Sequence, residues 1–338
     1  MKINSILDIL EAKLLNEPSV EEITNIHFEV KRIQRKDMLI ADNLIIEEIK
    51  QAIEHGAYAI VFENDDIKFE EIDTEIAWIK VSNIKDATTR LLRFALANIH
   101  FNAYYVSPVQ IEYLRCLSYS SKNLVFLDGN IESDFDKLKS ITKDAFVFGC
   151  DDKFMTKVYP MTTSFKPLVP KIDNLIIHSP FSSSFTLADD KYTHIKVPRI
   201  YLNDFVASVS FLKEQGFYKD LKELKNFEYF KPIFINKDCK EVDFGASNKI
   251  LILQKDSTIL EYELRYISQS LSYARVVIVL PLFFKSKFDY EDSFYYESID
   301  EVQSIIQNEN YDFAYIFAKN YDEIDSMINN ENPQTTLF

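Results

Sequence analysis

Acidic side chains stand directly after two apolar segments of this chain. Asp151 and Asp152 follow the segment AFVFG at 145–149, and Asp128 follows the segment NLVFL at 123–127. Both segments have the composition of buried strands, and open α/β sheets bind ligands at the carboxyl ends of their strands. Paired carboxylates at such a position can hold Mg²⁺, so Asp151 and Asp152 are candidate ligand-binding residues. The alternative is that these carboxylates lie in solvated loops.

Other side chains that support catalysis lack the neighbours that they need. Cys150 would be a nucleophile only with a histidine close by, and the alternative is a buried structural thiol. No two histidines have i,i+2 or i,i+4 spacing, so the sequence predicts no metal site built from them. The histidines are His27, His55, His100, His178 and His194. The serines at 182–184 have no Gly-x-Ser-x-Gly surroundings, which argues against a hydrolase triad.

The composition excludes several classes of partner. The formal net charge of -15 argues against nucleic acid and against an anionic membrane surface, because both attract clustered Lys and Arg. The amphipathic N-terminus is unlike a secretory signal, and no apolar run is long enough to span a bilayer. The three cysteines are widely separated, and we expect them to be reduced and mostly buried. These features predict a soluble, cytoplasmic protein.

One acidic stretch is also rich in aromatic residues. The sequence DYEDSFYYESIDE begins at Asp289. It is either a partner-binding surface or a loop whose aromatic side chains pack back onto a sheet.

Helical periodicity and buried strands alternate along the chain, as residues 47–64 illustrate. Ile49, Ala52 and Ile53 share one helical face, Gly56 stands where a helix end needs a left-handed residue, and 57–62 is an apolar strand. Further helices are predicted over 3–16, 84–100, 109–117, 203–216, 259–271, 299–307 and 321–328. Further strands are predicted over 27–33, 38–41, 77–81, 123–127, 145–149, 175–178, 184–187, 194–197, 249–253, 274–280 and 313–317.

This alternation predicts the α/β class with parallel, Rossmann-like sheets. We expect a small α/β domain over residues 1–105 and a central α/β domain over 106–246. A Rossmann-like C-terminal domain follows over 247–330, with a frayed tail at 331–338.

Three sets of stretches occur in the order in which one enzyme family has them. They are KDMLIA, AIEHGAYAIV and VSNIKDA at 36–41, 52–61 and 81–87; SFTL, VP and NDFVA at 184–187, 197–198 and 203–207; and IDEV and YDFAYI at 299–302 and 311–316. In this order the chain resembles the Mur ligases, most nearly their D-Ala-D-Ala-adding branch. These enzymes use ATP to extend the UDP-muramyl peptide of peptidoglycan. The resemblance implies a three-part layout with a UDP-binding domain first, and the central region of this chain is shorter than that of the family.

The sequence departs from that family where ATP is bound. The resemblance places a Gly-[Thr/Ser]-x-Gly-Lys-[Thr/Ser]-Thr loop soon after residue 100, but residues 100–110 read HFNAYYVSPVQ, without glycine or lysine. Such a loop needs glycines to bring backbone N–H groups onto phosphates and a lysine to reach them. The family's His-Asn pair is replaced by RIYL at 199–202, so that Asn203 alone survives of the polar positions. An Asp-Ser-Arg motif of the first domain is replaced by IQR at 33–35.

These observations favour the hypothesis that the chain is a non-catalytic pseudo-ligase. We expect a protein that binds a UDP-muramyl precursor or a cell-wall protein, uses no cofactor and forms no amide bond. Asn203, Asp151 and Asp152 are its candidate ligand-binding residues. One alternative is an unrelated α/β enzyme with an acidic, Mg²⁺-dependent site at Asp128 or at Asp151 and Asp152. Another is a scaffold protein without a nucleotide pocket, and the sequence leaves the oligomeric state open.

Overall fold

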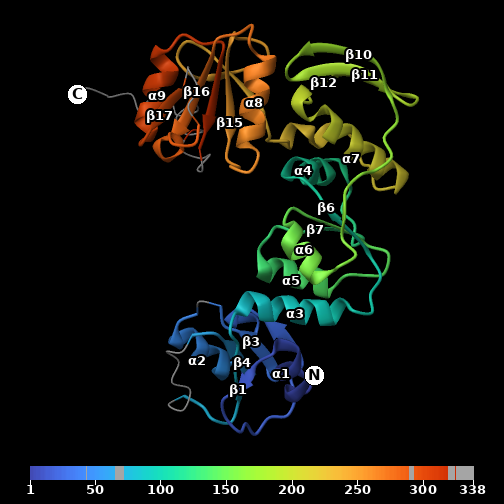
Figure 1. The fold of residues 1–338 in the computed structure, drawn as a ribbon, viewed down its shortest axis with the longest axis vertical. Helices are drawn as coiled ribbons and strands as arrows, with labels where there is room; N and C mark the ends of the chain where they lie inside the picture. Colours follow the sequence, from blue (N-terminus) through green and yellow to red (C-terminus); the bar gives the residue numbers. More distant parts are fainter. Residues whose placement is uncertain (43, 65–71, 289–292, 319–323, 325–338) are drawn as a thin grey trace, which may run out of the picture. The chain divides into compact units, whose positions relative to one another are not determined.

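A computed structural model describes residues 1–42, 44–64, 72–288, 293–318 and 324 (Figure 1). The chain forms two compact units. Unit 1 comprises residues 1–111 and 119–166, and unit 2 comprises residues 112–118 and 167–338. Apart from residue 324, the predicted helix at 321–328 and the predicted tail at 331–338 lie outside the described residues. The domain boundaries predicted near residues 105 and 246 stay predictions.

Unit 1 contains two sheets in the described part of the chain. Its strands are β1 (Lys13–Leu14), β2 (Ile26–His27), β3 (Asp37–Ile40), β4 (Ala57–Phe62), β5 (Ala77–Lys80), β6 (Asn102–Tyr105), β7 (Leu124–Phe126), β8 (Phe146–Gly149) and β9 (Thr163–Ser164). The first sheet has the order β1-β5-β4-β3-β2, with only β1 antiparallel to its neighbour. The second has the order β7-β8-β6-β9 and is parallel throughout.

Helices cover these sheets. They are α1 (Ile3–Leu10), the 3-10 helix η1 (Val30–Arg32), α2 (Ile46–Glu54), α3 (Ile84–Leu96), α5 (Ile131–Lys139) and α6 (Asp152–Val158). Helix α4 (Pro108–Leu117) instead packs through Tyr113 on Phe205 and Phe227 of unit 2. Helix α3 contacts α1 on one side and α5 and α6 on the other, so that one apolar core extends from the first sheet to the second. Helix α4 runs from unit 1 into unit 2.

The alternation of side chains along β4 explains why both faces of the first sheet are covered. Ala59 and Val61 join the core that α1 and α3 share, while Ile60 and Phe62 pack on the opposite face under α2. The only tryptophan of the chain, Trp78, is fully buried on that second face and meets the ring of Phe62 edge to face. A strand buried on both faces reads as the continuous apolar run that the sequence shows.

The turn between α2 and β4 confirms the role predicted for Gly56. Its φ is +102°, a region that favours glycine. A Cβ built at this position would also lie 2.9 Å from the Cα of Arg35, so both the conformation and the space require glycine.

Two predictions for the N-terminal segment are wrong in extent. The predicted helix 3–16 ends at Leu10, because Glu11 turns left-handed (φ 53°) and the chain then pairs as β1 with β5. The predicted strand 27–33 stops after His27 and curls into η1. This turn carries the chain around the sheet edge, so that Phe28 and Ile33 are buried in the cores of opposite faces.

Unit 2 combines an antiparallel ribbon with a larger sheet. Its strands are β10 (Ile172–Ser179), β11 (Ser182–Leu187), β12 (Asp190–Ile195), β13 (Pro232–Ile235), β14 (Glu241–Val242), β15 (Lys249–Gln254), β16 (Val276–Pro281), β17 (Ser293–Tyr296) and β18 (Phe313–Phe317). Its helices are η3 (Arg199–Tyr201), α7 (Leu202–Glu214), η4 (Lys222–Asn226), α8 (Leu260–Ser270), η5 (Leu282–Phe284) and α9 (Ile299–Asn308).

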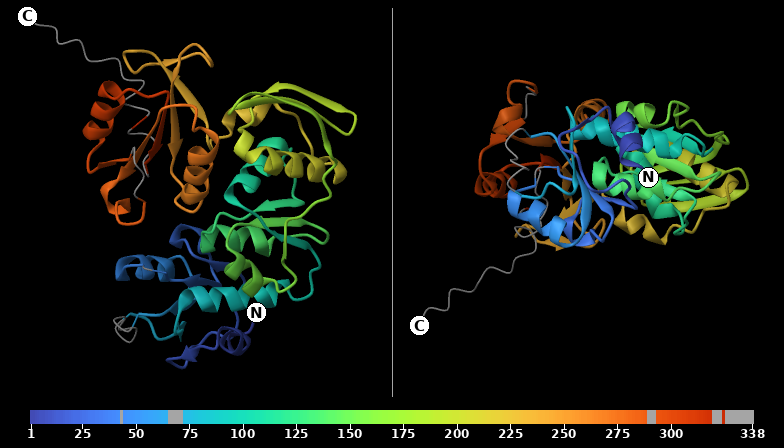
Figure 2. Two further views of the ribbon diagram at one scale, coloured as in Figure 1. Left: turned by 45° about the horizontal axis from the view of Figure 1, so that its top comes forward. Right: turned by 90° about the horizontal axis from the view of Figure 1, so that it is seen from below.

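The larger sheet has the Rossmann-like character that the sequence predicted. Its described strands have the order β14-β13-β15-β18-β16-β17, and β15, β18, β16 and β17 are parallel. Helices α8 and α9 lie on opposite faces of this sheet (Figures 1 and 2). The ribbon has the order β10-β11-β12 and packs against α7 through Phe185, Tyr192 and Phe205. The prediction of the α/β class is confirmed.

The acidic and aromatic stretch contributes a strand. Residues 289–292 lie outside the described residues, and Ser293–Tyr296 forms β17. The hydroxyl of Tyr296 donates a hydrogen bond to the carbonyl oxygen of Phe317 at 2.8 Å, and Phe294 packs on the core of the sheet. These aromatic side chains therefore pack onto the sheet.

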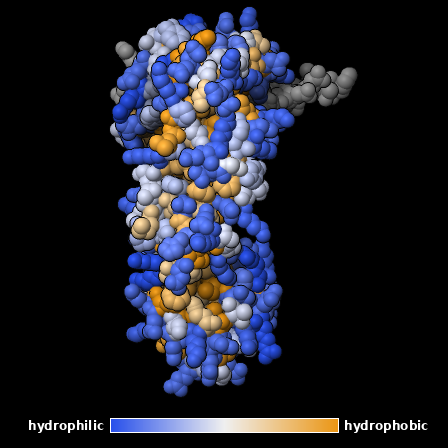
Figure 3. Space-filling model, turned by 90° about the vertical axis from the view of Figure 1, so that its right-hand side faces the viewer, coloured by the Kyte–Doolittle hydropathy of each residue, from blue (hydrophilic) through white to orange (hydrophobic). Residues whose placement is uncertain are grey.

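Most of the face drawn in Figure 3 is hydrophilic, with apolar side chains gathered in patches. Among the described residues, every helix is too short or too polar to cross a bilayer.

Candidate functional site

The two predicted aspartates after β8 lie at the start of α6. Asp151 is the N-cap of this helix, and its Oδ1 accepts a hydrogen bond from the backbone N–H of Phe154 at 2.9 Å. Asp152 occupies the first turn, and both side chains are exposed. Capping stabilises a helix without any ligand, so it gives Asp151 a structural reason to be present. The ligand-binding role of both residues stays a prediction.

The turn after β7 is closed by a carboxylate from α5. Asp134 is buried and accepts hydrogen bonds from the backbone N–H groups of Asp128 and Gly129 at 2.8 and 2.9 Å. Burial raises the pKa of Asp134, and these hydrogen bonds and the ammonium of Lys137 oppose the rise. Asp128 itself forms an ion pair with Lys137. No group of three or more His, Cys, Asp or Glu side chains in the described ranges is placed to hold a metal ion.

The cysteines do not match the prediction that they are mostly buried. Cys150 is exposed, because the chain leaves the sheet directly after Gly149, while Cys239 is buried and Cys116 is half-buried. Burial beside Glu112 raises the pKa of the Cys116 thiol to about 12, which keeps it protonated and unreactive at neutral pH.

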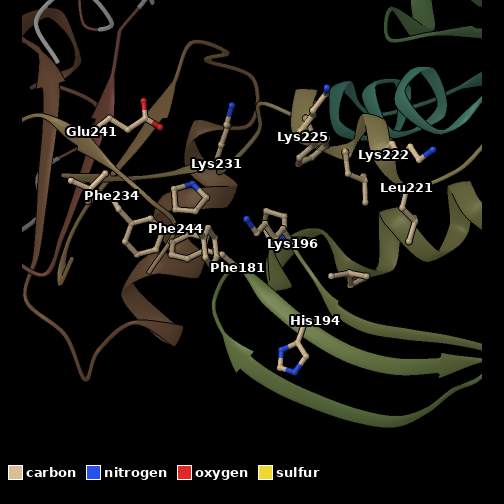
Figure 4. A pocket seen from close by; sticks show the side chains of 16 residues that line it. Phe181, His194, Lys196, Leu221, Lys222, Lys225, Lys231, Phe234, Glu241 and Phe244 are labelled. Carbon is tan, nitrogen blue, oxygen red and sulfur yellow. The ribbon is translucent and has the colours of Figure 1, made fainter. Parts of the chain in front are cut away.

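A pocket in unit 2 gathers basic and aromatic side chains. It has a volume of about 590 Å³ and lies among the ribbon, η4 and the β13–β14 hairpin (Figure 4). Its basic residues are Lys196 after β12, Lys222 and Lys225 on η4, and Lys231 before β13. We call it the lysine pocket. Among the described residues that line it, Glu241 is the only acidic one.

The charges of the lysine pocket are not neutralised by the fold. Within the described ranges, none of its four lysines forms an ion pair, although the chain as a whole carries an excess of acids. The ammonium of Lys196 instead lies 4.4 Å from the ring centroid of Phe244. That ring is 41% exposed and contacts Phe234, with 4.9 Å between the two centroids. The pocket thus offers positive charge beside an accessible aromatic face.

The side chains of the lysine pocket suit the binding of an anion. Besides the four lysines, its described lining includes His194 and Glu241, and most of the remaining side chains are apolar or aromatic. Ammonium groups are point charges that suit phosphates and carboxylates, and aromatic faces suit planar or apolar groups. The arrangement fits an anion that also carries an apolar or planar part.

The sequence reasoning missed this pocket, although one signal was present. Four lysines fall between residues 219 and 231 of an otherwise acidic chain, and three of them line the pocket. The fourth lining lysine, Lys196, comes from a different segment, and only the fold brings it near the others.

A buried carboxylate lies elsewhere in unit 2. Glu263 of α8 is fully buried and accepts hydrogen bonds from the hydroxyls of Tyr201 and Tyr315 and from Gln254 Nε2, the last at 2.8 Å. Burial raises the pKa of Glu263, and the three hydrogen bonds oppose the rise. We call these four residues the Glu263 cluster. It joins η3, α8 and the larger sheet.

Comparison with solved structures identifies the architecture. MurF ligase from Thermotoga maritima in complex with ADP aligns at a TM-score of 0.54 and 10% identity, covering 90% of this chain and 96% of that one. A crystal structure of MurF from Acinetobacter baumannii aligns at 0.52 and 10% identity, covering 97% of each. This chain has a Mur-ligase-like fold. No family model and no curated protein matches the sequence, so the likeness concerns the fold.

Within this Mur-ligase-like fold, residues 100–110 form a strand, a short connection and a helix start. Val106 and Ser107 alone connect β6 to α4, and Val106 is buried. Ser107 and Gln110 close the helix start reciprocally: Ser107 Oγ accepts from the N–H of Gln110 at 3.1 Å, and Gln110 Oε1 accepts from the N–H of Ser107 at 3.0 Å. The backbone N–H groups of Ser107 and Gln110 therefore donate to side chains of the protein itself. In a phosphate-binding loop, N–H groups at a helix start donate to the ligand.

The surviving polar position of the central helix is accessible. Asn203 lies in the first turn of α7 and is exposed. The preceding Tyr201, at a position where the resemblance places the lost His-Asn pair, donates to Glu263 inside the protein. The ligand-binding role of Asn203 stays a prediction.

Proposed function

We propose that this chain is a non-catalytic protein of Mur-ligase-like fold that binds an anionic cell-wall precursor in the lysine pocket. A UDP-muramyl peptide is the precursor class that fits best, since it carries phosphates, carboxylates and a planar base. The proposal rests above all on four lysines that surround one pocket without forming an ion pair to any described residue.

The connection between β6 and α4 supports the absence of ATP-driven ligation. It has no glycine to bring the backbone close to phosphates and no lysine to reach a γ-phosphate. Its helix start is closed by Ser107 and Gln110. We therefore expect binding without turnover and without a cofactor.

Thermal shift and calorimetry with the purified full chain test the proposal. The ligands are UDP, a UDP-muramyl peptide and ATP-Mg²⁺. A ligand at about 100 times its Kd stabilises the fold by about 2.7 kcal/mol. We expect the largest shift with the UDP-muramyl peptide and smaller ones with UDP and ATP-Mg²⁺, which offer phosphates and a base but no peptide carboxylates. Amide formation coupled to ATP hydrolysis would overturn the non-catalytic part.

A pair of matched variants tests whether the lysine pocket is the site. Lys225→Ala with Lys231→Ala removes two lining charges, while Lys237→Ala with Lys240→Ala removes two exposed charges nearby that do not line the pocket. A hydrogen bond to a charged group is worth about 1.5–3 kcal/mol, so the first variant should bind at least about tenfold more weakly. Equal loss in both variants would mean a general charge effect and would place the site elsewhere. No shift with any ligand would favour a protein partner.

A further inference from the structure

A second pocket of unit 2 borders the lysine pocket. It has a volume of about 450 Å³, and its described lining comes from the end of β10 and the turn after it, from η3, and from α8 and the segment that follows it. Arg199 and His178 are the basic residues of this described lining, which contains no acidic residue. We call it the arginine pocket.

The two pockets share a wall made of two chain segments. In the turn after β10, Pro180 lines the arginine pocket and Phe181 lines the lysine pocket. Where the chain passes from β12 into η3, Pro198 lines the lysine pocket and Arg199 lines the arginine pocket. The backbone N–H of Arg199 donates to the carbonyl oxygen of Pro180 at 2.8 Å and ties the two segments together. The pockets are therefore direct neighbours.

Two stacked histidines lie at the boundary between the pockets. His194 lines the lysine pocket and His178 lines the arginine pocket, and their rings stack with 4.0 Å between the centroids and 19° between the planes. Ser184 of β11 accepts a hydrogen bond from the N–H of His194 at 2.9 Å, and its Oγ lies 2.7 Å from Nε2 of His178. Both histidines are exposed to solvent, so this boundary presents imidazole rings to a ligand. A ligand longer than one pocket can pass over it into the other.

The guanidinium of Arg199 is available to such a ligand. Arg199 is exposed and forms no ion pair with a described residue. Burial raises the pKa of Tyr266, and the positive charge of Arg199 opposes that rise, so the guanidinium lies near this tyrosine of the pocket. A guanidinium presents a planar fork of N–H donors that matches the two oxygens of a carboxylate.

The charges of the two pockets differ in number as well as in kind. One guanidinium balances the single negative charge of a carboxylate, whereas the four ammonium groups of the lysine pocket suit the several charges of a diphosphate. Ile177 and Tyr273, which are 41% and 72% exposed, add apolar surface to the arginine pocket. The last residue of a peptide combines a carboxylate with a side chain that such a surface can contact.

We infer that the arginine pocket binds the C-terminal carboxylate of the precursor's peptide while the lysine pocket binds its diphosphate. This inference rests on the proposed function and assigns the two ends of that ligand. An extended peptide spans about 3.3 Å per residue, so a few residues reach from one pocket into its neighbour. Binding thus selects a precursor by the end of its peptide as well as by its nucleotide.

Calorimetry with two forms of one UDP-muramyl peptide tests the inference without any variant. One form has a free C-terminal carboxylate, and in the other this carboxylate is converted to an amide. The wild type should bind the amide form at least about tenfold more weakly, the usual effect of losing a hydrogen bond between charged groups. Equal affinity for the two forms overturns the inference.

A charge-removing variant tests whether Arg199 is the partner of that carboxylate. Arg199→Gln should bind the free-carboxylate form about tenfold more weakly than the wild type does, and the amide form equally well. Arg265→Gln is the matched control, since it removes an exposed guanidinium of α8 that pairs with Glu261 and does not line the pocket, and it should leave both affinities unchanged. An equal loss for both forms in Arg199→Gln overturns the inference. Thermal melts without ligand show that each variant is folded.

UDP alone separates this inference from the proposed function. UDP has no carboxylate, so Arg199→Gln should bind it as the wild type does, whereas Lys225→Ala with Lys231→Ala should weaken the binding of UDP and of both peptide forms. If the lysine variant behaves in this way while the wild type binds the two peptide forms equally, the proposed function stands and the inference fails. No binding of either peptide form to the wild type overturns the inference together with the proposed function.

Discussion

Unit 2 contains a buried charged group, Glu263, and a group of exposed charges, the four lysines of the lysine pocket. In the Glu263 cluster a carboxylate is fully buried and every donor around it points at it. In the lysine pocket four ammonium groups stand in solvent and form no ion pair with a described residue. A buried charge must be satisfied by the fold itself, because an unsatisfied one costs several kcal/mol. Exposed charges that the fold leaves unpaired remain available to a ligand.

This contrast separates residues that hold the protein together from residues that bind. Changes in the Glu263 cluster should lower stability, whereas changes in the lysine pocket should lower affinity and leave stability unchanged. Each of the following experiments tests one side of that division.

Glu263→Ala should produce the largest effect on stability. It leaves the donors of Tyr201, Tyr315 and Gln254 buried without their acceptor, so we expect a loss of about 3–5 kcal/mol in the free energy of unfolding. Urea unfolding followed by circular dichroism measures it. Glu261→Ala on the same helix removes an exposed carboxylate paired with Arg265 and should cost less than about 0.5 kcal/mol. A loss below about 1 kcal/mol for Glu263→Ala would mean that the Glu263 cluster contributes little to the stability of the fold.

Salt should weaken ligand binding in the lysine pocket by about tenfold, since the Debye length falls from about 10 Å at 0.1 M to about 3 Å at 1 M ionic strength. Titration of the UDP-muramyl peptide at both ionic strengths measures this change. An affinity that is the same at both ionic strengths would mean that apolar contacts dominate the binding.

The free energy of unfolding of the Lys225→Ala, Lys231→Ala variant should lie within about 0.5 kcal/mol of the wild-type value, because both side chains are exposed and unpaired in the described structure.

Ser107→Ala should cost about 1 kcal/mol of stability, the usual value of a helix N-cap. The variant frees the N–H of Gln110 at the start of α4, and urea unfolding detects the loss. Affinity for the UDP-muramyl peptide should not change. A loss of affinity without a loss of stability would mean that Ser107 contributes to ligand binding and not to the stability of α4.

Glu263→Gln should alter the pH dependence of stability, and this is the smallest effect. The pKa of Glu263 is raised above its ordinary 4.5, so the folded chain holds this proton more tightly than the unfolded chain. The resulting stabilisation is complete below pH 4.5 and is lost as the pH rises through the folded-state pKa. The stability of the variant relative to the wild type should therefore increase from pH 4.5 toward neutrality. A difference that is constant with pH would contradict the raised pKa.

The sequence predicted best those elements whose signal is local. Continuous apolar runs revealed β4 and β15, and the positive φ of Gly56 and Gly216 matches their predicted places at helix ends. Helices α5 and α6 were missed because they are only 9 and 7 residues long, so their apolar residues, although helically spaced, form too short a pattern to separate from a loop. The residues of the lysine pocket were harder to predict, because they come from segments far apart in the sequence that only the fold brings together.

The position of Trp78 has a practical consequence. It is the only tryptophan of the chain and is fully buried in unit 1, where its Nε1 donates to the carbonyl oxygen of Asp73 at 2.5 Å. Its fluorescence therefore reports the melting of unit 1 alone, while circular dichroism averages the whole chain. Denaturation curves recorded with both signals on one sample will coincide only if the two units unfold together. The protein carries a built-in optical reporter of its own cooperativity.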